Sequence, residues 1–309
     1  MVSVHGIHTI DTGFVRPGFD AAYLIVESGR GAFVDCGTGF AVPRMLAALD
    51  EARLTPADVD WLILTHVHLD HAGGAGELIA RLPNAQLVVH PRGARHMIDP
   101  TALWAGASAV YGTAVMEQTY GRLVPVDADR VVEAADGQVV NLAGRALLCI
   151  HSPGHAKHHI AVHDERANVC FTGDVFGLSY REFDSANGPF ILPTTSPVQF
   201  DPDALHASIE RLVALKPAAM YLTHYDRVEN AATLAEDLHQ QIDAMVALAL
   251  ALVAKGDPRR HEALVEALTD LYVMRAAAHG CSQNREELLV LLGMDIELNA
   301  QGLEVWLDR

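Results

Sequence analysis

Up to about residue 229 the chain consists of short apolar runs bounded by Gly, Pro, Asn and Asp, which is the pattern of β-strands. We expect strands at residues 7–10, 22–27, 31–35, 61–64, 86–90, 130–133, 138–142, 146–151, 160–163, 168–171 and 218–222. Apolar residues at helical spacing predict helices over residues 43–52, 76–82 and 203–215. This mixture predicts an α+β fold.

After Glu229 the composition changes to helix formers with apolar residues at helical spacing. The pattern predicts a long helix through residues 234–252 that ends at Gly256-Asp257-Pro258, and a second helix through residues 264–271. Two more are expected, at residues 282–292 before Gly293 and from Asp295 onward. We therefore predict one domain over residues 1–230 and an all-α extension over residues 231–309, which serves packing or homodimerisation.

The segment from residue 101 to residue 123 has no clear periodicity, and Trp104, Tyr111, Met116 and Tyr120 lie among small residues. Aromatic side chains in such a segment fit a lid over a site or a contact between subunits. A helical excursion packed on the body of the domain explains the same composition equally well. The sequence leaves both interpretations open.

Acidic residues outnumber basic ones by 39 to 22, which gives a net charge of −17. Only three of the basic residues are lysines, Lys157, Lys216 and Lys255. A chain this negative is poorly suited to bind a phosphate backbone or an anionic membrane. We expect a small-molecule substrate, with neither nucleic acid nor membrane as a partner.

The four cysteines, Cys36, Cys149, Cys170 and Cys281, are scattered and form no Cys-x-x-Cys pair. Such cysteines are typical of free thiols in a reducing compartment. The N-terminus lacks the charged and then apolar shape of a signal peptide. The most apolar run, residues 244–254, is shorter than the roughly 20 residues that span a bilayer. We therefore expect a cytoplasmic protein.

The densest group of polar residues follows the predicted strand at residues 61–64 and contains His66, His68, Asp70 and His71, with two glycines behind it. On an extended loop alternate residues point the same way, so His66 and His68 can share one metal ion. Asp70 and His71 would then turn toward a second ion. Imidazole and carboxylate donors suit zinc, iron or manganese, with zinc as the first choice.

Three further polar residues each follow a predicted strand: His155 after Ser-Pro-Gly, Asp174 after Thr-Gly, and His224 after Tyr-Leu-Thr. Together they supply the donors that two coordination spheres still need. Asp35, in Asp-Cys-Gly-Thr-Gly, is either a hydrogen-bond partner of a ligand or a simple turn residue. Tyr180 is a candidate donor to a substrate carbonyl.

Other histidines fit less well as ligands. The spacing of His158 and His159 after His155 places them beside the site or at the surface. His90 and His151 lie in strand-like runs and are expected in the core. We therefore predict seven metal ligands and leave these four histidines out.

The order His-x-His-x-Asp-His, His, Asp, His on strand ends resembles the metallo-β-lactamase superfamily over about residues 1–230. The ending Leu298-Asn299-Ala300-Gln301-Gly302-Leu303 is similar to that of a hydrolase branch with helical C-terminal extensions. The resemblance implies a four-layer αβ/βα sandwich with a dinuclear site at one sheet edge. It also implies the ligand sets: His66, His68 and His155 for one ion, Asp70, His71 and His224 for the other, and Asp174 as the bridge.

Two divalent ions about 3.5–4 Å apart lower the pKa of a bridging water from 15.7 toward neutrality. The resulting hydroxide would attack an ester, thioester or lactone carbonyl, and Asp70 would shuttle the proton. We therefore predict a dinuclear metal-dependent hydrolase, similar to glyoxalase II or to the acyl-homoserine lactonases. Its two ions are expected to be Zn²⁺, with iron or manganese as alternatives.

Two other functions fit the same residues. One is a mononuclear iron dioxygenase acting on persulfides, which the superfamily includes, and the other is a binding protein without turnover. The flavin-linked di-iron members have Glu where this chain has His68, which disfavours electron transfer. Metal analysis distinguishes these alternatives.

Overall fold

The computed structural model describes residues 5–255 and 259–309. The chain forms two compact units that interleave along the sequence. The first consists of Met1–His151, His158–Gly173 and Ala218–Arg227, and the second of Ser152–Lys157, Asp174–Pro217 and Val228–Arg309. The domain boundary at residue 230 stays a prediction. The predicted helix end at Gly256-Asp257-Pro258 lies outside the described residues.

Two six-stranded sheets account for all the predicted strands. In the first sheet the strands follow chain order: β1 (Ile7–Asp11), β2 (Ala21–Glu27), β3 (Arg30–Val34), β4 (Val59–Ile63), β5 (Gln86–Val89) and β6 (Val131–Glu133). The second sheet has the order β12 (Asp226–Val228), β11 (Ala219–Leu222), β10 (Val169–Gly173), β9 (Ile160–Asp164), β8 (Arg145–His151) and β7 (Val139–Leu142). Both contain parallel and antiparallel pairs. The short strand β12 was not predicted, because its charged residues show no apolar pattern.

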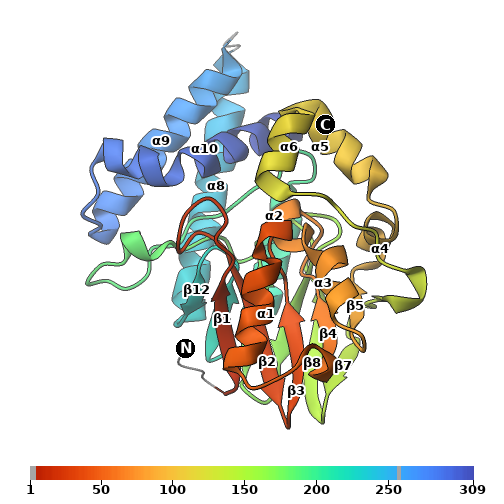
Figure 1. Ribbon diagram of the computed structural model, residues 1–309. Coiled ribbons are helices and arrows are strands. Elements are labelled where there is room, and N and C mark those ends of the chain that lie inside the picture. The colour runs from red at the N-terminus through yellow and green to blue at the C-terminus, as the bar shows by residue number, and fades with distance from the viewer. Residues whose placement is uncertain (1–4, 256–258) are drawn as a thin grey trace. The chain divides into compact units, whose positions relative to one another are not determined.

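Side chains from both sheets meet in one apolar core within the first unit. The Tyr23 ring lies with its centroid 5.2 Å from those of Phe171 and Tyr221. A second core lies between the first sheet and the helices that cover it, α1 (Val42–Glu51) and α3 (Ala75–Arg81), as Figure 1 shows. The predicted α+β fold with facing sheets and helices outside them is confirmed.

The first unit has four further helices between residues 69 and 120. They are α2 (Leu69–Ala72), α4 (Pro91–Ile98), α5 (Thr101–Tyr111) and α6 (Thr113–Tyr120). Residues 101–120 are thus mostly helical, in agreement with the helical excursion, while a lid function stays a prediction. Short 3₁₀ turns lie at Gly39–Ala41, Pro56–Asp58, Ala128–Arg130 and Arg181–Phe183.

The second unit contains the long helices α7 (Pro202–Val213), α8 (Ala231–Lys255), α9 (Arg260–His279) and α10 (Arg285–Leu307). The predicted helical C-terminal part is therefore confirmed. The predicted break at Gly293 is wrong, because α10 runs through it. Glycine costs about 1 kcal/mol relative to alanine inside a helix. Leu292 and Ile296, both fully buried on either side of it, outweigh that cost.

One helical stretch among the described residues, Ala231–Ala254, is long and apolar enough to cross a membrane by length and composition alone. An 18-residue window within it has a mean hydropathy of 1.2, and 28% of that window is buried inside the structure. The apolar stretch is therefore longer than the predicted run of residues 244–254. Because α8 packs against α7, α9 and α10, it also fits the ordinary role of a helix in a folded unit.

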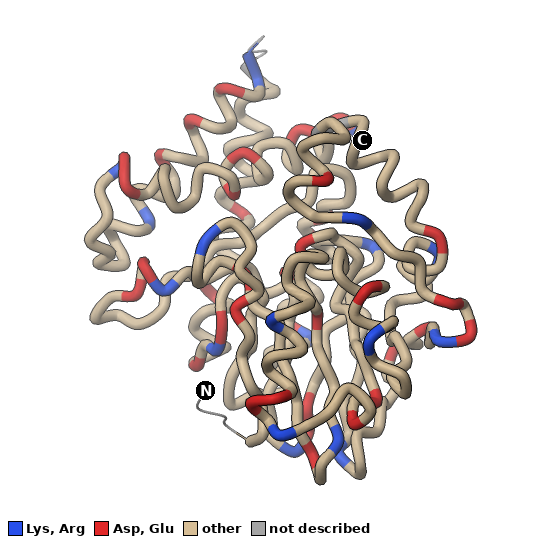
Figure 2. Tube along the Cα trace, in the orientation of Figure 1, with Lys and Arg blue, Asp and Glu red and all other residues tan. Residues whose placement is uncertain are grey.

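Figure 2 shows Lys and Arg spaced among Asp and Glu along the described trace, without a basic stripe. Several of these charges are paired within their unit. Arg145, for example, is buried and bonded to Asp164, which is also buried. The expectation that the protein has no nucleic-acid partner stays a prediction.

His90 and His151 form a pair of rings whose centroids are 4.3 Å apart, at the ends of β5 and β8. His90 is buried, and its Nδ1 accepts a hydrogen bond from the Arg92 N–H. Burial, with smaller effects of His151 and Arg92, lowers the pKa of His90 to about 4. Of the two histidines expected in the core, His90 is buried, whereas His151 is only half-buried.

We expect the metal-free protein to lose stability as the pH falls from about 6.5 to about 4. Over this range the unfolded chain binds a proton at His90 that the folded chain does not, so acid favours unfolding. Thermal unfolding of wild type and His90→Gln at pH 7.5 and pH 5 measures the effect. The variant should show the smaller pH dependence, and equal pH dependence in the two proteins would contradict the assignment.

Candidate metal centre

Strand ends place the candidate ligands of the first unit. Asp35 directly follows β3, and Thr65 and His66 follow β4, which is parallel to β3. Because parallel strands end at the same edge of a sheet, side chains of both loops converge there. His68 is the N-cap residue of the short helix α2, which presents Asp70 and His71.

Asp70, His71 and His224 form a group whose ligand atoms all lie within 4.8 Å of one another. Asp70 Oδ2 is 3.7 Å from Nε2 of His71 and 3.5 Å from Nε2 of His224. Both histidines are buried, whereas Asp70 is half-buried. The group lies wholly within the first unit and can hold a metal ion.

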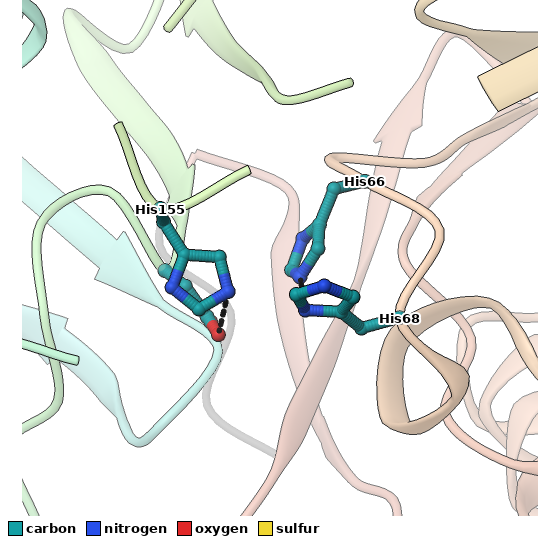
Figure 3. Close-up of side chains that lie close together, drawn as sticks. His66, His68 and His155 are labelled. Carbon is teal, nitrogen blue, oxygen red and sulfur yellow. Dashed lines mark hydrogen bonds and ion pairs between the residues drawn. The ribbon is translucent and has the colours of Figure 1, made fainter. Parts of the chain in front are cut away.

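His66 and His68, labelled in Figure 3, form a second pair of donors in the first unit. Nε2 of His66 is 2.8 Å from Nδ1 of His68. Nδ1 of His66 contacts the Thr65 hydroxyl at 3.2 Å. The His66 ring also stacks on the buried His159 ring, with the centroids 4.9 Å apart. Of the two positions expected for His159, beside the site or at the surface, the structure has the one beside His66.

His155 and Asp174 form the corresponding pair in the second unit. Nε2 of His155, a residue also labelled in Figure 3, lies 3.3 Å from Oδ2 of Asp174. Nδ1 of His155 contacts the Thr194 carbonyl at 3.2 Å. Both members of the pair are buried.

Three of these histidines share a property that suits a metal ion. Nδ1 contacts an oxygen acceptor in each: the Asp35 carboxylate for His71, the Phe19 carbonyl for His224 and the Thr194 carbonyl for His155. In each, Nε2 lies near a neighbouring candidate carboxylate. Metal-binding histidines almost always have such a partner on the other ring nitrogen, which fixes the tautomer and the orientation of the ring. The donor set therefore fits a divalent metal ion.

The Asp35 carboxylate contacts His71 and two threonines beside the candidate ligands. Its carboxylate accepts hydrogen bonds from the Thr65 backbone at 2.8 Å, from the Thr65 hydroxyl at 2.8 Å and from the Thr223 hydroxyl at 3.3 Å. The same carboxylate lies 3.0 Å from Nδ1 of His71. Of the two roles considered for Asp35, the structure supports that of a ligand's partner.

Asp20 was not singled out from the sequence. It is buried, and its carboxylate accepts a hydrogen bond from the Thr12 hydroxyl, 2.5 Å away. Burial raises the pKa of Asp20 to about 7, although the nearby His224 and His71 act in the opposite direction. Asp20 has no motif around it, and only its position before β2 brings it close to these histidines.

Tyr180 is fully buried, and its hydroxyl donates to the Asp295 carboxylate of α10 at 3.2 Å. This contact gives Tyr180 a role within the second unit. The suggested contact with a substrate carbonyl stays a prediction. His158 is also buried, with its ring centroid 5.6 Å from that of His68, so of its two expected places it takes the one beside the site.

A known protein family matches the part of the chain that contains these residues. The family model described as "Metallo-beta-lactamase superfamily" matches residues 15–224, which include every candidate ligand. The chain belongs to the metallo-β-lactamase superfamily. The resemblance stated from the ligand order is confirmed.

Relatives within the superfamily include several enzymes. The metallo-β-lactamase fold-containing protein ST1585 of Sulfurisphaera tokodaii is 28% identical over 71% of this chain and 78% of its own length. A hydroxyacylglutathione hydrolase of Acidiphilium cryptum is 28% identical over 83% of this chain and 86% of its own. The acyl-coenzyme A thioesterase MBLAC2 of Bos taurus is 28% identical over 55% of this chain and 63% of its own.

A solved structure has the same fold. The crystal structure of ST1585 from Sulfolobus tokodaii aligns with a TM-score of 0.66 and 24% identity, over 98% of this chain and 99% of that chain. With the His and Asp donors described above, this superfamily member is a metal-dependent hydrolase.

Proposed function

We propose that this metallo-β-lactamase superfamily protein is a dinuclear hydrolase that cleaves an ester, thioester or lactone. His66, His68, His155 and Asp174 would hold one divalent ion, and Asp70, His71 and His224 the other, with Asp174 as the bridge. The group of Asp70, His71 and His224, whose ligand atoms lie within 4.8 Å of one another, is the observation that carries the proposal. Zinc suits a set of imidazole nitrogens and carboxylate oxygens best.

Bound divalent ions would supply Lewis acidity and lower the pKa of a water molecule, so that it can attack at neutral pH. Proton transfer is assigned to Asp70 in this proposal, because its carboxylate lies near two imidazoles and is half-buried. It would accept a proton from the attacking water and return it to the leaving oxygen or sulfur. His71 and His224 are kept in one orientation by the Asp35 carboxylate and the Phe19 carbonyl.

The relatives favour a thioester within this class. A hydroxyacylglutathione hydrolase and an acyl-coenzyme A thioesterase are both among the similar proteins. A lactone presents the same carbonyl chemistry and belongs in the same screen. We further propose that the protein is cytoplasmic and forms a homodimer. The net charge of −17 supports the proposal that it has no nucleic-acid or membrane partner.

Elemental analysis and a substrate screen test the proposal. We expect two divalent ions per chain, hydrolysis of thioesters or lactones, loss of activity on chelation and recovery when zinc is added back. Phosphodiesters, included in the same screen, should not be cleaved. One iron per chain with thiol-dependent oxygen uptake would instead identify a dioxygenase. Bound metal without turnover of any substrate would favour a binding protein.

A further inference from the structure

We propose that the C-terminal helix α10 is part of the support of the metal centre, because Asn299 and Gly302 position the segment at residues 193–196 and this segment orients His155. The proposal rests on the proposed function, in which His155 is a metal ligand. All of these residues belong to the second unit. The role is one of positioning, since α10 acts on the centre through His155.

Residues 194 and 196 hold both the ring and the backbone of His155. The Thr194 carbonyl contacts Nδ1 of the ring at 3.2 Å, and the Ser196 hydroxyl donates to the His155 carbonyl at 2.6 Å. The backbone just before His155 is held by α7, because the Ser208 hydroxyl donates a hydrogen bond to the Pro153 carbonyl at 2.6 Å. The direction of the imidazole therefore depends on where residues 194 and 196 lie.

Residues 193–196 form no helix or strand, so no backbone ladder fixes their position. The buried amide of Asn299 takes over this task. Its Oδ1 accepts from the Thr195 N–H at 2.7 Å, and its Nδ2 donates to the Pro193 carbonyl at 3.1 Å. Nδ2 also donates to the Tyr272 hydroxyl at 2.8 Å, which ties the amide to α9. Asn299 thus fixes the backbone on both sides of Thr194.

Gly302 brings α10 into direct contact with the same segment. A Cβ atom at this position would lie 2.0 Å from Oγ1 of Thr195 and 3.1 Å from the Ser196 carbonyl oxygen. No real Cβ comes so close, so any side chain would displace the segment. The Asn-Ala-Gln-Gly run of α10 therefore combines an amide that binds the segment with a glycine that makes room for it.

The consequence for the metal centre follows from the Thr194 contact. With Nδ1 held by the Thr194 carbonyl, Nε2 stays near the Asp174 carboxylate, 3.3 Å away. If the segment moves, the ring loses this constraint. Losing the partner that orients a metal ligand typically costs about 10–100-fold in metal affinity or activity.

Two glycines of the same helix provide a matched test. A Cβ at Gly302 collides with Thr195, whereas a Cβ at Gly293 has nothing within 4 Å. We expect Gly302→Ala to lower the affinity for one of the two metal ions about 10–100-fold. Gly293→Ala should leave both affinities unchanged. Titration of the metal-free proteins with zinc against a chromophoric chelator measures the affinities, and the cobalt(II) absorption spectrum reports the ligand geometry.

A second pair of variants covers the case in which Gly302→Ala fails to fold. Asn299→Leu removes the amide that holds the segment, and Asn284→Leu removes the N-cap of the same helix, far along it from the segment. Only Asn299→Leu should lower the metal affinity and alter the cobalt(II) absorption spectrum. Wild-type affinities and spectra in folded Asn299→Leu or Gly302→Ala would overturn the inference. A wild-type protein that binds no divalent metal would overturn the proposed function itself.

Discussion

Replacing His66 or Asp174 with alanine is expected to lower metal content and turnover together. His66 is buried with its ring against His68, and Asp174 is buried against His155, so each change removes a donor from the centre of the proposed site. Removing one preorganised group that stabilises the developing charge typically costs about 10²–10³-fold in kcat. We expect a loss of at least that size in both variants.

Metal content by elemental analysis and initial rates on the same preparations measure this result. His96→Ala is a suitable control, because His96 is half-buried on α4 and belongs to neither donor group. It should retain both metal and activity. Full metal content in Asp174→Ala would contradict the assignment of Asp174 as the bridging ligand.

Asp35→Asn is expected to have the second largest effect. The side-chain amide retains an oxygen but presents an NH₂ group where the carboxylate now meets His71, Thr65 and Thr223. The preferred tautomer of His71 is then lost, with a cost of about 10–100-fold in metal affinity or activity. Leaving buried donors unsatisfied adds a destabilisation of about 1–3 kcal/mol.

Zinc titration of the metal-free protein and chemical unfolding separate these two effects. Asp58→Asn is the matched control, since Asp58 is a half-buried turn aspartate that accepts hydrogen bonds from the Thr55 backbone N–H and hydroxyl. The control should lose a little stability and no metal affinity. Equal metal affinity in wild type and Asp35→Asn would mean that Asp35 acts only as a turn residue.

The sequence predicted the sheets well, because buried strands leave an apolar run between turn residues. The motif from His66 to His71 could also be recognised from the sequence, because several candidate metal ligands within a few positions rarely occur outside a functional site. In the structure Asp70 and His71 lie with His224, and the His66 ring lies against both His68 and His71, with its centroid 4.0 Å from that of His71. Their roles as ligands remain for the metal experiments to test.

Residues that act through tertiary contacts were harder to predict. Asp20 approaches His224 only because β2 and the end of β11 come together, and no spacing in the sequence encodes that approach. The sequence analysis named Asn299 only as part of residues 298–303, whose sequence is similar to the ending of a hydrolase branch. Its function depends on a contact with Thr195, which is 104 positions away.

The continuity of α10 illustrates a different limit. Local propensity indicated a break at Gly293, but Leu292 and Ile296 are both buried and keep the helix in one piece. Packing often overrides propensity in this way. The result matters for the site, because Asn299 and Gly302 lie on the far part of the same continuous helix.

The contacts between distant parts of the chain also decide when a metal ion can bind during synthesis. The Ala21 N–H bonds to the Thr223 carbonyl and the Thr9 hydroxyl to Asp226, so the first strands are completed by residues made some 200 positions later. At about 5–20 residues per second, roughly 8–30 s separate the translation of His71 from that of His224. During that time the His66 to His71 loop emerges from the ribosome without its remaining donors. The proposed group of Asp70, His71 and His224 can therefore form only after His224 has been made.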